Sequence, residues 1–328
     1  MKIVLLYLIL IFLNNCSFDD KSGIWENDSK IYKNKKDSFS QFKSVSTSID
    51  PFNEIIEIKK DYKFKLSKKI NPTSWKQIHF NQNNNLNNFE YKNLNELFFK
   101  GKKISKYKVS EYIFYENGNI INSDMKGNIN VFSVTDNKTL IKFNFYKKKY
   151  NKINKKLNLI VENNIIYVSD NFGYLYAYNY FDRKLLWAKN YNVPFRSNLK
   201  IYKNTIFAAN QNNNLFFFNK LTGEILKQIP TEETIVKNNF INSLSLDEKN
   251  IFFLNTYGTL YSVDIKSKRI NWFINLNQSL DINPNNMFNG SQIINSGGKI
   301  ITSSNQFLYI LDSKTGSIIF KKNFPILI

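Results

Sequence analysis

The stretch IIYVSDNFGYLYAYNYFDRKLLW, from Ile165 to Trp187, is one copy of a repeat that recurs along the second half of the sequence. Its most recognisable part is a short apolar core that follows a central turn. Successive cores begin 46, 40, 45 and 48 residues apart. The five copies of the core are Ile129–Phe132, Leu175–Tyr178, Leu215–Phe218, Leu260–Val263 and Leu308–Leu311. A period of about 40 to 50 residues with several short strands per unit predicts a β-propeller, with one blade for each repeat.

Turn residues and large rings recur at matching offsets around these cores. Four positions after the start of the core stands a turn-opening amide or carboxylate: Asn179, Asn219, Asp264 or Asp312. Glycines recur before the core and at the end of the following turn, where glycine adopts positive φ without steric cost: Gly127, Gly173, Gly258, Gly223 and Gly316. Twelve positions after the start of the core stands a large ring: Trp187, Trp272 or Phe320.

The strands around the central turn are apolar on both faces, which is typical of strands covered on both sides. Examples are Ile165–Val168, Leu215–Phe218 and Ile251–Leu254. A further strand precedes each repeat, as in Leu157–Val161, Asn198–Tyr202 and Ser243–Leu246, so that each blade has four strands. The alternative is a two-sheet sandwich, which does not require glycine and tryptophan at fixed offsets.

Composition limits the classes of function. The net charge of +20 invites a nucleic-acid hypothesis. However, the lysines lie mainly in turns and loops, and no RNP motif, recognition helix or arginine-rich stripe is present, so we predict no nucleic-acid partner. A single Cys and a single His, His79, exclude a disulfide framework, a cysteine-based metal site and a multi-histidine centre. We interpret His79 as a packing or surface residue.

The N-terminus has the features of a lipoprotein signal. A short basic start and an apolar core, Ile3 to Leu13, lead to the only Cys of the chain, Cys16. This predicts a signal peptide over residues 1–15 and lipidation at Cys16, followed by a polar tether over residues 16–60. We expect the propeller to occupy residues 61–328, with a lone strand at Tyr62–Leu66 and a loop or blade edge at Asn71–Phe89.

The number of blades leaves two interpretations open. Five repeats are clear, and residues 61–328 offer room for about six blades at this period. Either the chain forms a six-bladed ring of unusual closure, or the sequence is a C-terminally incomplete copy of a longer ring. We favour the second interpretation.

The repeat G-x-L-Y-A-x-N/D-x-x-T-G-x-x-x-W resembles the quinoprotein-type (PQQ-like) propeller repeat. Together with the lipoprotein signal, it is similar to the BamB family of outer-membrane assembly lipoproteins. The resemblance covers about residues 60 to 328 and implies an eight-bladed ring, lipid-anchored at the periplasmic face of the outer membrane. It also implies a non-catalytic scaffold without a cofactor, which binds the POTRA domains of a BamA-type partner and assists the insertion of nascent β-barrel proteins.

The resemblance also implies a binding site on a link between blades. Family members contact BamA partly through a loop that contains leucine and arginine, and the corresponding link here is Val193–Arg196. Phe195 would be the apolar anchor and Arg196 its cationic partner, a pair common at interface hot spots. Alternatively, Phe195 packs between blades.

Two other functions remain open. A quinone-dependent dehydrogenase shares this fold, but it needs a cluster of carboxylates, and we interpret the one close acidic pair, Glu232 and Glu233, as a solvated turn. An envelope lipoprotein that binds polysaccharide or peptidoglycan through rim aromatics such as Tyr257 and Phe288 is the main alternative. Aromatics clustered on one open face would favour it.

Overall fold

The computed structural model describes residues 68–71, 73–86, 88–90, 97, 99–150, 152–233, 240–277, 288–304 and 307–323. The predicted signal peptide, Cys16, the whole of the predicted tether and the strand Tyr62–Leu66 lie outside these residues. No helix in the described ranges is long and apolar enough to span a bilayer.

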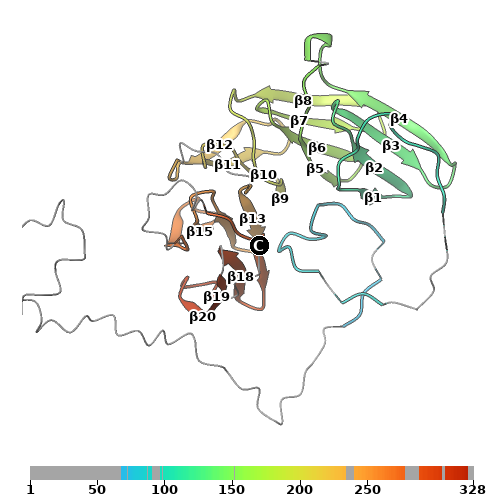
Figure 1. Ribbon diagram of the computed structural model, residues 1–328. Helices are drawn as coiled ribbons and strands as arrows, with labels where there is room; N and C mark the ends of the chain where they lie inside the picture. Colours follow the sequence, from blue (N-terminus) through green and yellow to red (C-terminus); the bar gives the residue numbers. More distant parts are fainter. Residues whose placement is uncertain are drawn as a thin grey trace, which may run out of the picture. The chain divides into compact units, whose positions relative to one another are not determined.

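Twenty strands in the described ranges form five antiparallel sheets of four strands, which follow one another in chain order (Figure 1). The first sheet contains β1 (Phe114–Glu116), β2 (Asn119–Ser123), β3 (Asn128–Ser133) and β4 (Lys138–Asn144). After the short 3-10 helix η2 (Lys148–Tyr150), the second contains β5 (Leu157–Glu162), β6 (Ile165–Asp170), β7 (Tyr174–Asn179) and β8 (Lys184–Asn190). The third contains β9 (Lys200–Tyr202), β10 (Thr205–Ala209), β11 (Leu215–Asn219) and β12 (Ile225–Ile229).

The fourth sheet contains β13 (Ser243–Leu246), β14 (Asn250–Leu254), β15 (Thr259–Asp264) and β16 (Ile270–Asn275). The fifth contains β17 (Ile294–Ser296), β18 (Lys299–Ser304), β19 (Phe307–Asp312) and β20 (Ile318–Asn323). Each apolar core of the repeat is the third strand of its sheet, and the strand expected before each repeat is the first. The predicted all-β fold of four-stranded blades is confirmed.

The sheets pack face to face through four apolar clusters. Each cluster joins one sheet to the next: the first to the second, the second to the third, and so on to the fifth. The middle strands of a sheet between two others are therefore buried on both faces, as β11 is throughout its apolar part. Five successive sheets joined in this way are not a two-sheet sandwich, so that alternative is wrong.

The repeated tryptophan and glycine have one shared role, because each tryptophan packs on the glycine turn of the next sheet. Trp187 donates its indole N–H to the carbonyl of Lys220 at 3.1 Å. A Cβ at Gly223, where φ is +74°, would lie 2.5 Å from the Trp187 ring. Trp272 and Gly316 repeat this arrangement between the fourth and fifth sheets. The fixed offsets in the sequence thus record a contact between neighbouring blades.

Residues 75–85, which we call the hub segment, run along the first strands of the sheets. The backbone of Trp75 exchanges two hydrogen bonds with Tyr115 of β1, each 2.8 Å long. Further bonds reach β5, β9, β13 and β17 in turn: Lys76 to Val161, Gln82 to Ile201 and Leu246, and Asn83 to Asn295. The Asn71–Phe89 region, predicted as a loop or blade edge, thus supplies a segment that contacts the first strand of all five sheets. The contacted residues lie in the middle or the C-terminal part of those strands.

Lys200 anchors the hub segment from β9. Its side chain is 1% exposed, and its ammonium donates to Gln77 Oε1 at 3.0 Å, to the carbonyl of Asn81 at 2.9 Å and to Asn84 Oδ1 at 2.5 Å. These three acceptors are neutral, so burial lowers the pKa of Lys200 to about 7. Burial and the nearby Lys200 charge lower the pKa of His79 to about 4. His79 is therefore a partly buried, neutral side chain of the hub segment at pH 7.

Candidate functional site

The connections between sheets lie on one face of the fold, which we call the link face. The link from β8 to β9 contacts the β6–β7 turn, where Tyr191 N–H donates to the carbonyl of Gly173 at 2.8 Å. It also contacts the corresponding turn of the next sheet, where Gln211 N–H donates to the carbonyl of Pro194 at 2.8 Å. This face carries the N-terminal ends of the first strands, whereas the hub segment contacts their middle or C-terminal parts.

Phe195 lies within this link as a core residue. Its side chain is 3% exposed and belongs to the apolar cluster between the second and third sheets. Its ring is 6.0 Å from those of both Tyr191 and Phe218, edge-on to each, and its N–H donates to the carbonyl of Asp170. Phe195 therefore packs between blades in this structure, and its role as a partner anchor stays a prediction.

Arg196 joins the links that enter the third and fourth sheets. Its Nη2 donates to the carbonyl of Phe240 at 3.0 Å, and its own carbonyl accepts from Asn242 N–H at 2.9 Å. The side chain is partly buried, and this burial lowers the pKa of the guanidinium. Arg196 is thus a partly accessible cation held in place on the link face.

Glu232, on the link from β12 to β13, holds the next turn in place. Its carboxylate accepts from the hydroxyl of Tyr261 at 2.5 Å, from Asn255 Nδ2 at 3.0 Å and from Thr259 Oγ1 at 3.2 Å. Burial and the Glu232 carboxylate together raise the pKa of Tyr261. The interpretation as a solvated turn is wrong for Glu232, although Glu233 is exposed. Among the described side chains, no three of His, Cys, Asp or Glu are grouped so that they could hold a metal ion.

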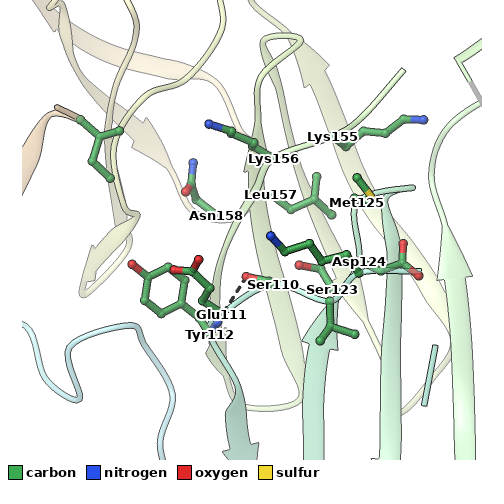
Figure 2. Close-up of a pocket in the computed structure, with 13 residues that line it drawn as sticks. Ser110, Glu111, Tyr112, Ser123, Asp124, Met125, Lys155, Lys156, Leu157 and Asn158 are labelled. Carbon is green, nitrogen blue, oxygen red and sulfur yellow. Dashed lines mark hydrogen bonds between the residues drawn. The ribbon is translucent and has the colours of Figure 1, made fainter. Parts of the chain in front are cut away.

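A cavity of about 350 Å³ opens at the N-terminal ends of β1 and β5. We call it the hub pocket, although none of its lining residues belongs to the hub segment. Figure 2 shows Lys156 and Asn158 on one side of it and Glu111 and Tyr112 on the other. Residues 108–112, 123–125 and 155–158 line it, together with Ile241 from the link into β13. Ile241 follows Phe240, the acceptor of the Arg196 bond, so the pocket and Arg196 share the link face.

The charged groups of the hub pocket differ in burial and in the hydrogen bonds that they form within the protein. The buried Asp124 carboxylate accepts from the Ser105 hydroxyl at 2.6 Å and from the side-chain amide of Asn128 at 2.8 Å, as well as from two backbone N–H groups. Lys155 is 4% exposed and donates to the carbonyl of Tyr150 at 2.5 Å. Lys108 and Lys156, by contrast, are exposed cations of the pocket.

The rim aromatics named for glycan binding do not form a pair on an open face. Tyr257 is 41% exposed, whereas Phe288 is 2% exposed. The Phe288 ring packs edge-on against Phe240, with centroids 5.2 Å apart, and it covers Gly258. Only one of these two rings is therefore available to a ligand.

Known proteins support the assignment of the repeat to the PQQ-type propeller. The family model for "Outer membrane protein assembly factor BamB" matches residues 125–233. Those residues run from the end of the first sheet's second strand to the link after β12. The described strands form a BamB-like propeller of PQQ-type repeats.

Solved structures of low sequence identity share this BamB-like fold. BamB from Moraxella catarrhalis superposes with a TM-score of 0.56 at 11% identity, over 65% of this chain and 63% of that one. The quinohemoprotein alcohol dehydrogenase from Comamonas testosteroni gives a TM-score of 0.55 at 11% identity, over 76% of this chain and 49% of that one. The computationally designed Ika8 protein gives 0.53 at 12% identity, over 66% and 61% of the two chains. No curated protein matches the sequence.

The sequence analysis did not single out Lys200, the contacts of the hub segment or the hub pocket. One signal for Lys200 was present, because a lysine stands between Leu199 and Ile201 in the strand predicted at Asn198–Tyr202. A lysine is rarely fully buried unless it has partners. The partners themselves come from residues more than a hundred positions earlier, which no local pattern indicates.

Proposed function

We propose that this BamB-like chain is a non-catalytic scaffold lipoprotein of the outer-membrane β-barrel assembly machinery. In this proposal it binds the POTRA domains of a BamA-type partner and assists nascent β-barrel proteins. Acylated Cys16 anchors it at the periplasmic face of the outer membrane, and residues 16–60 give the propeller its reach. The observation that carries the proposal is the match of residues 125–233 to the BamB assembly-factor family.

The link face is the surface that we assign to the BamA-type partner. Its backbone is held by bonds between turns of neighbouring sheets, so a partner meets a preformed surface and little ordering is needed on binding. Arg196 supplies a cation that the carbonyl of Phe240 holds in position. In this arrangement Arg196 is the contact residue, and the buried Phe195 ring acts by supporting the link.

The test is co-isolation from detergent-solubilised envelopes of the lipidated protein. The variants are Arg196→Glu and, as a matched control, Arg269→Glu, which changes an exposed arginine in the β15–β16 turn on the opposite face. We expect a BamA-type protein to accompany the wild type and Arg269→Glu, and to be lost with Arg196→Glu. Circular dichroism establishes that all three proteins are folded.

The other outcomes separate the site from the function. If the BamA-type protein accompanies all three chains, the function holds and Arg196 is not the contact residue. If it accompanies none of them, although each is folded and lipidated, the scaffold function is refuted. Binding of purified peptidoglycan by the same preparations would then support the glycan alternative.

A further inference from the structure

One wall of the hub pocket is the edge of a strand whose backbone groups are only half used. Residues 108–110 pair with the end of β2, because Met125 N–H donates to the carbonyl of Lys108 at 2.9 Å and Ser110 N–H donates to that of Ser123 at 2.7 Å. In antiparallel pairing, the residues between such bonds direct their backbone groups to the other side. Those residues are Val109 and Glu111, and no described residue forms a hydrogen bond with their N–H or C=O groups.

This edge is accessible, and no described residue pairs with it. Val109 and Tyr112 are each 40% exposed, and both line the pocket. An exposed strand edge with free N–H and C=O groups is a template for another extended chain. The other side of the same segment is already occupied by the end of β2, so only the pocket side can accept a strand.

The charges around this edge favour an acidic ligand. Lys108 and Lys156 are exposed in the pocket, and neither ammonium forms an ion pair within the part of the chain that the structure describes. Asp124 forms no ion pair with either lysine in the described ranges, and its oxygens accept hydrogen bonds from donors of its own turn and from Ser105. Glu111 is the one exposed carboxylate of the lining.

The size and lining of the pocket indicate a short segment with apolar side chains. A volume of about 350 Å³ lies at the lower end of the range of ligand pockets, which is enough for a few residues and too small for a folded domain. Tyr112, Met125 and Leu157 offer apolar surface next to the lysines. In an extended peptide successive side chains point to opposite sides, so acidic and apolar groups can alternate along it.

We propose that the hub pocket binds a short extended peptide with alternating acidic and apolar residues, which adds as a strand to the free edge at Val109 and Glu111. The acidic side chains meet Lys108 and Lys156, and the apolar ones lie against Tyr112 and Leu157. This site is distinct from the Arg196 contact and does not depend on a BamA-type partner.

The test uses the full chain and a fluorescein-labelled peptide of eight residues in which Glu and Val alternate. The variant Lys108→Glu/Lys156→Glu is compared with Lys184→Glu/Lys227→Glu, which reverses two exposed lysines on the outer strands β8 and β12. We expect fluorescence anisotropy to show binding that weakens with salt and that falls by about tenfold or more in the pocket variant, with less than about a twofold change in the control. A peptide with Lys in place of each Glu is expected not to bind.

A second change tests strand addition separately from charge. Val109→Pro removes an N–H that no described residue uses, and it leaves the bonds of Lys108 and Ser110 to the end of β2 intact. We expect it to reduce peptide binding about tenfold. If this variant does not fold, the same test is made on the wild type with a peptide that is N-methylated at alternate residues.

Three results would overturn the proposal. The first is equal binding to the pocket and control variants, and the second is binding of the Glu and Lys peptides alike. The third is competition by free glutamate at the same concentration as the peptide, which would indicate a site for small anions. Since none of these measurements involves Arg196, they leave the scaffold function untouched.

Discussion

The fourth and fifth sheets carry the same repeat, but they are buried differently. In the fourth sheet β14 and β15 are buried at almost every position, whereas in the fifth sheet burial alternates along β18 and β19. The fourth sheet shares one apolar cluster with the third and another with the fifth. The described residues give the fifth sheet a cluster only with the fourth. Only one face of the fifth sheet is therefore covered in this part of the chain.

The first leucine of the repeat core makes the difference plain. Leu260 in β15 is 0% exposed and packs in the cluster towards the fifth sheet. Leu308 holds the same repeat position in β19, but it is partly exposed and lies outside the four clusters. The same local pattern thus produces a core residue or a surface residue, depending on whether another sheet follows within the described residues. The first prediction below compares these two leucines.

The largest expected effect is at Leu260. Replacing a fully buried leucine by alanine costs the transfer free energy and leaves a cavity, so Leu260→Ala should lower the free energy of unfolding by about 2–5 kcal/mol. Leu308→Ala should cost about 1 kcal/mol or less, because most of the lost contact area is already missing. Urea denaturation followed by tryptophan fluorescence measures both values. Equal costs would show that the open face of the fifth sheet is covered in solution, for example by a second copy.

Two glycines of the fifth sheet with the same φ of +74° provide the next comparison. Gly316 lies under Trp272 of the fourth sheet, where a Cβ would be 2.5 Å from the ring, whereas a Cβ at Gly298 would be 4.0 Å from its nearest neighbour. Both changes to alanine incur the backbone cost of about 1–2 kcal/mol, and Gly316→Ala adds the cost of overpacking, about 1–3 kcal/mol. The thermal unfolding midpoint of Gly316→Ala should therefore be well below that of Gly298→Ala. Similar midpoints would mean that Trp272 moves aside freely.

Lys200 extends the comparison from the sheets to the hub. Its pKa of about 7 in the folded protein lies below the ordinary value of 10.5, so above pH 7 the unfolded chain binds more protons. Stability due to this group must then rise with pH from about 7 towards 10.5, by up to about 1.4 kcal/mol per pH unit. The unfolding free energy, measured from pH 7 to 9.5, should show this rise in the wild type and in Lys227→Met, but not in Lys200→Met. A rise that persists in Lys200→Met would contradict the assignment.

The smallest difference between the fourth and fifth sheets is expected in the pKa values of their turn-opening carboxyl groups. Asp264 and Asp312 open equivalent turns, and the backbone N–H groups of those turns lower the pKa of both carboxyl groups. A carboxyl whose pKa is lowered in the folded state contributes stability that is lost as the pH falls through that value. NMR titration should find both pKa values below the usual range for Asp. An ordinary pKa for Asp312 alone would show that the neighbouring sheet also influences the turn.

The local features of the fold could be predicted because they are repeated. The strands, the turn-opening Asn and Asp residues and the glycines depend on contacts within about twenty residues, so their pattern recurs in several of the copies. The Trp187 and Gly223 offsets could also be found, since the same contact recurs between another pair of neighbouring sheets and leaves the same spacing in the sequence. Of the candidate site, the sequence placed Phe195 and Arg196 on a link, but it left open whether the ring is exposed.

Which of these residues are buried, and which residues surround Lys200, depends on contacts between distant parts of the chain. Phe195 is in the core because two sheets meet around it, and Leu308 is partly exposed because the described residues place no sheet over it. Lys200 finds its acceptors in a segment 116 to 123 residues earlier in the chain. Such contacts occur once and join distant parts of the chain, so they leave no period in the sequence. The local sequence pattern therefore specifies each four-stranded blade, whereas the packing of the blades and the hub segment sets which surfaces are available for binding.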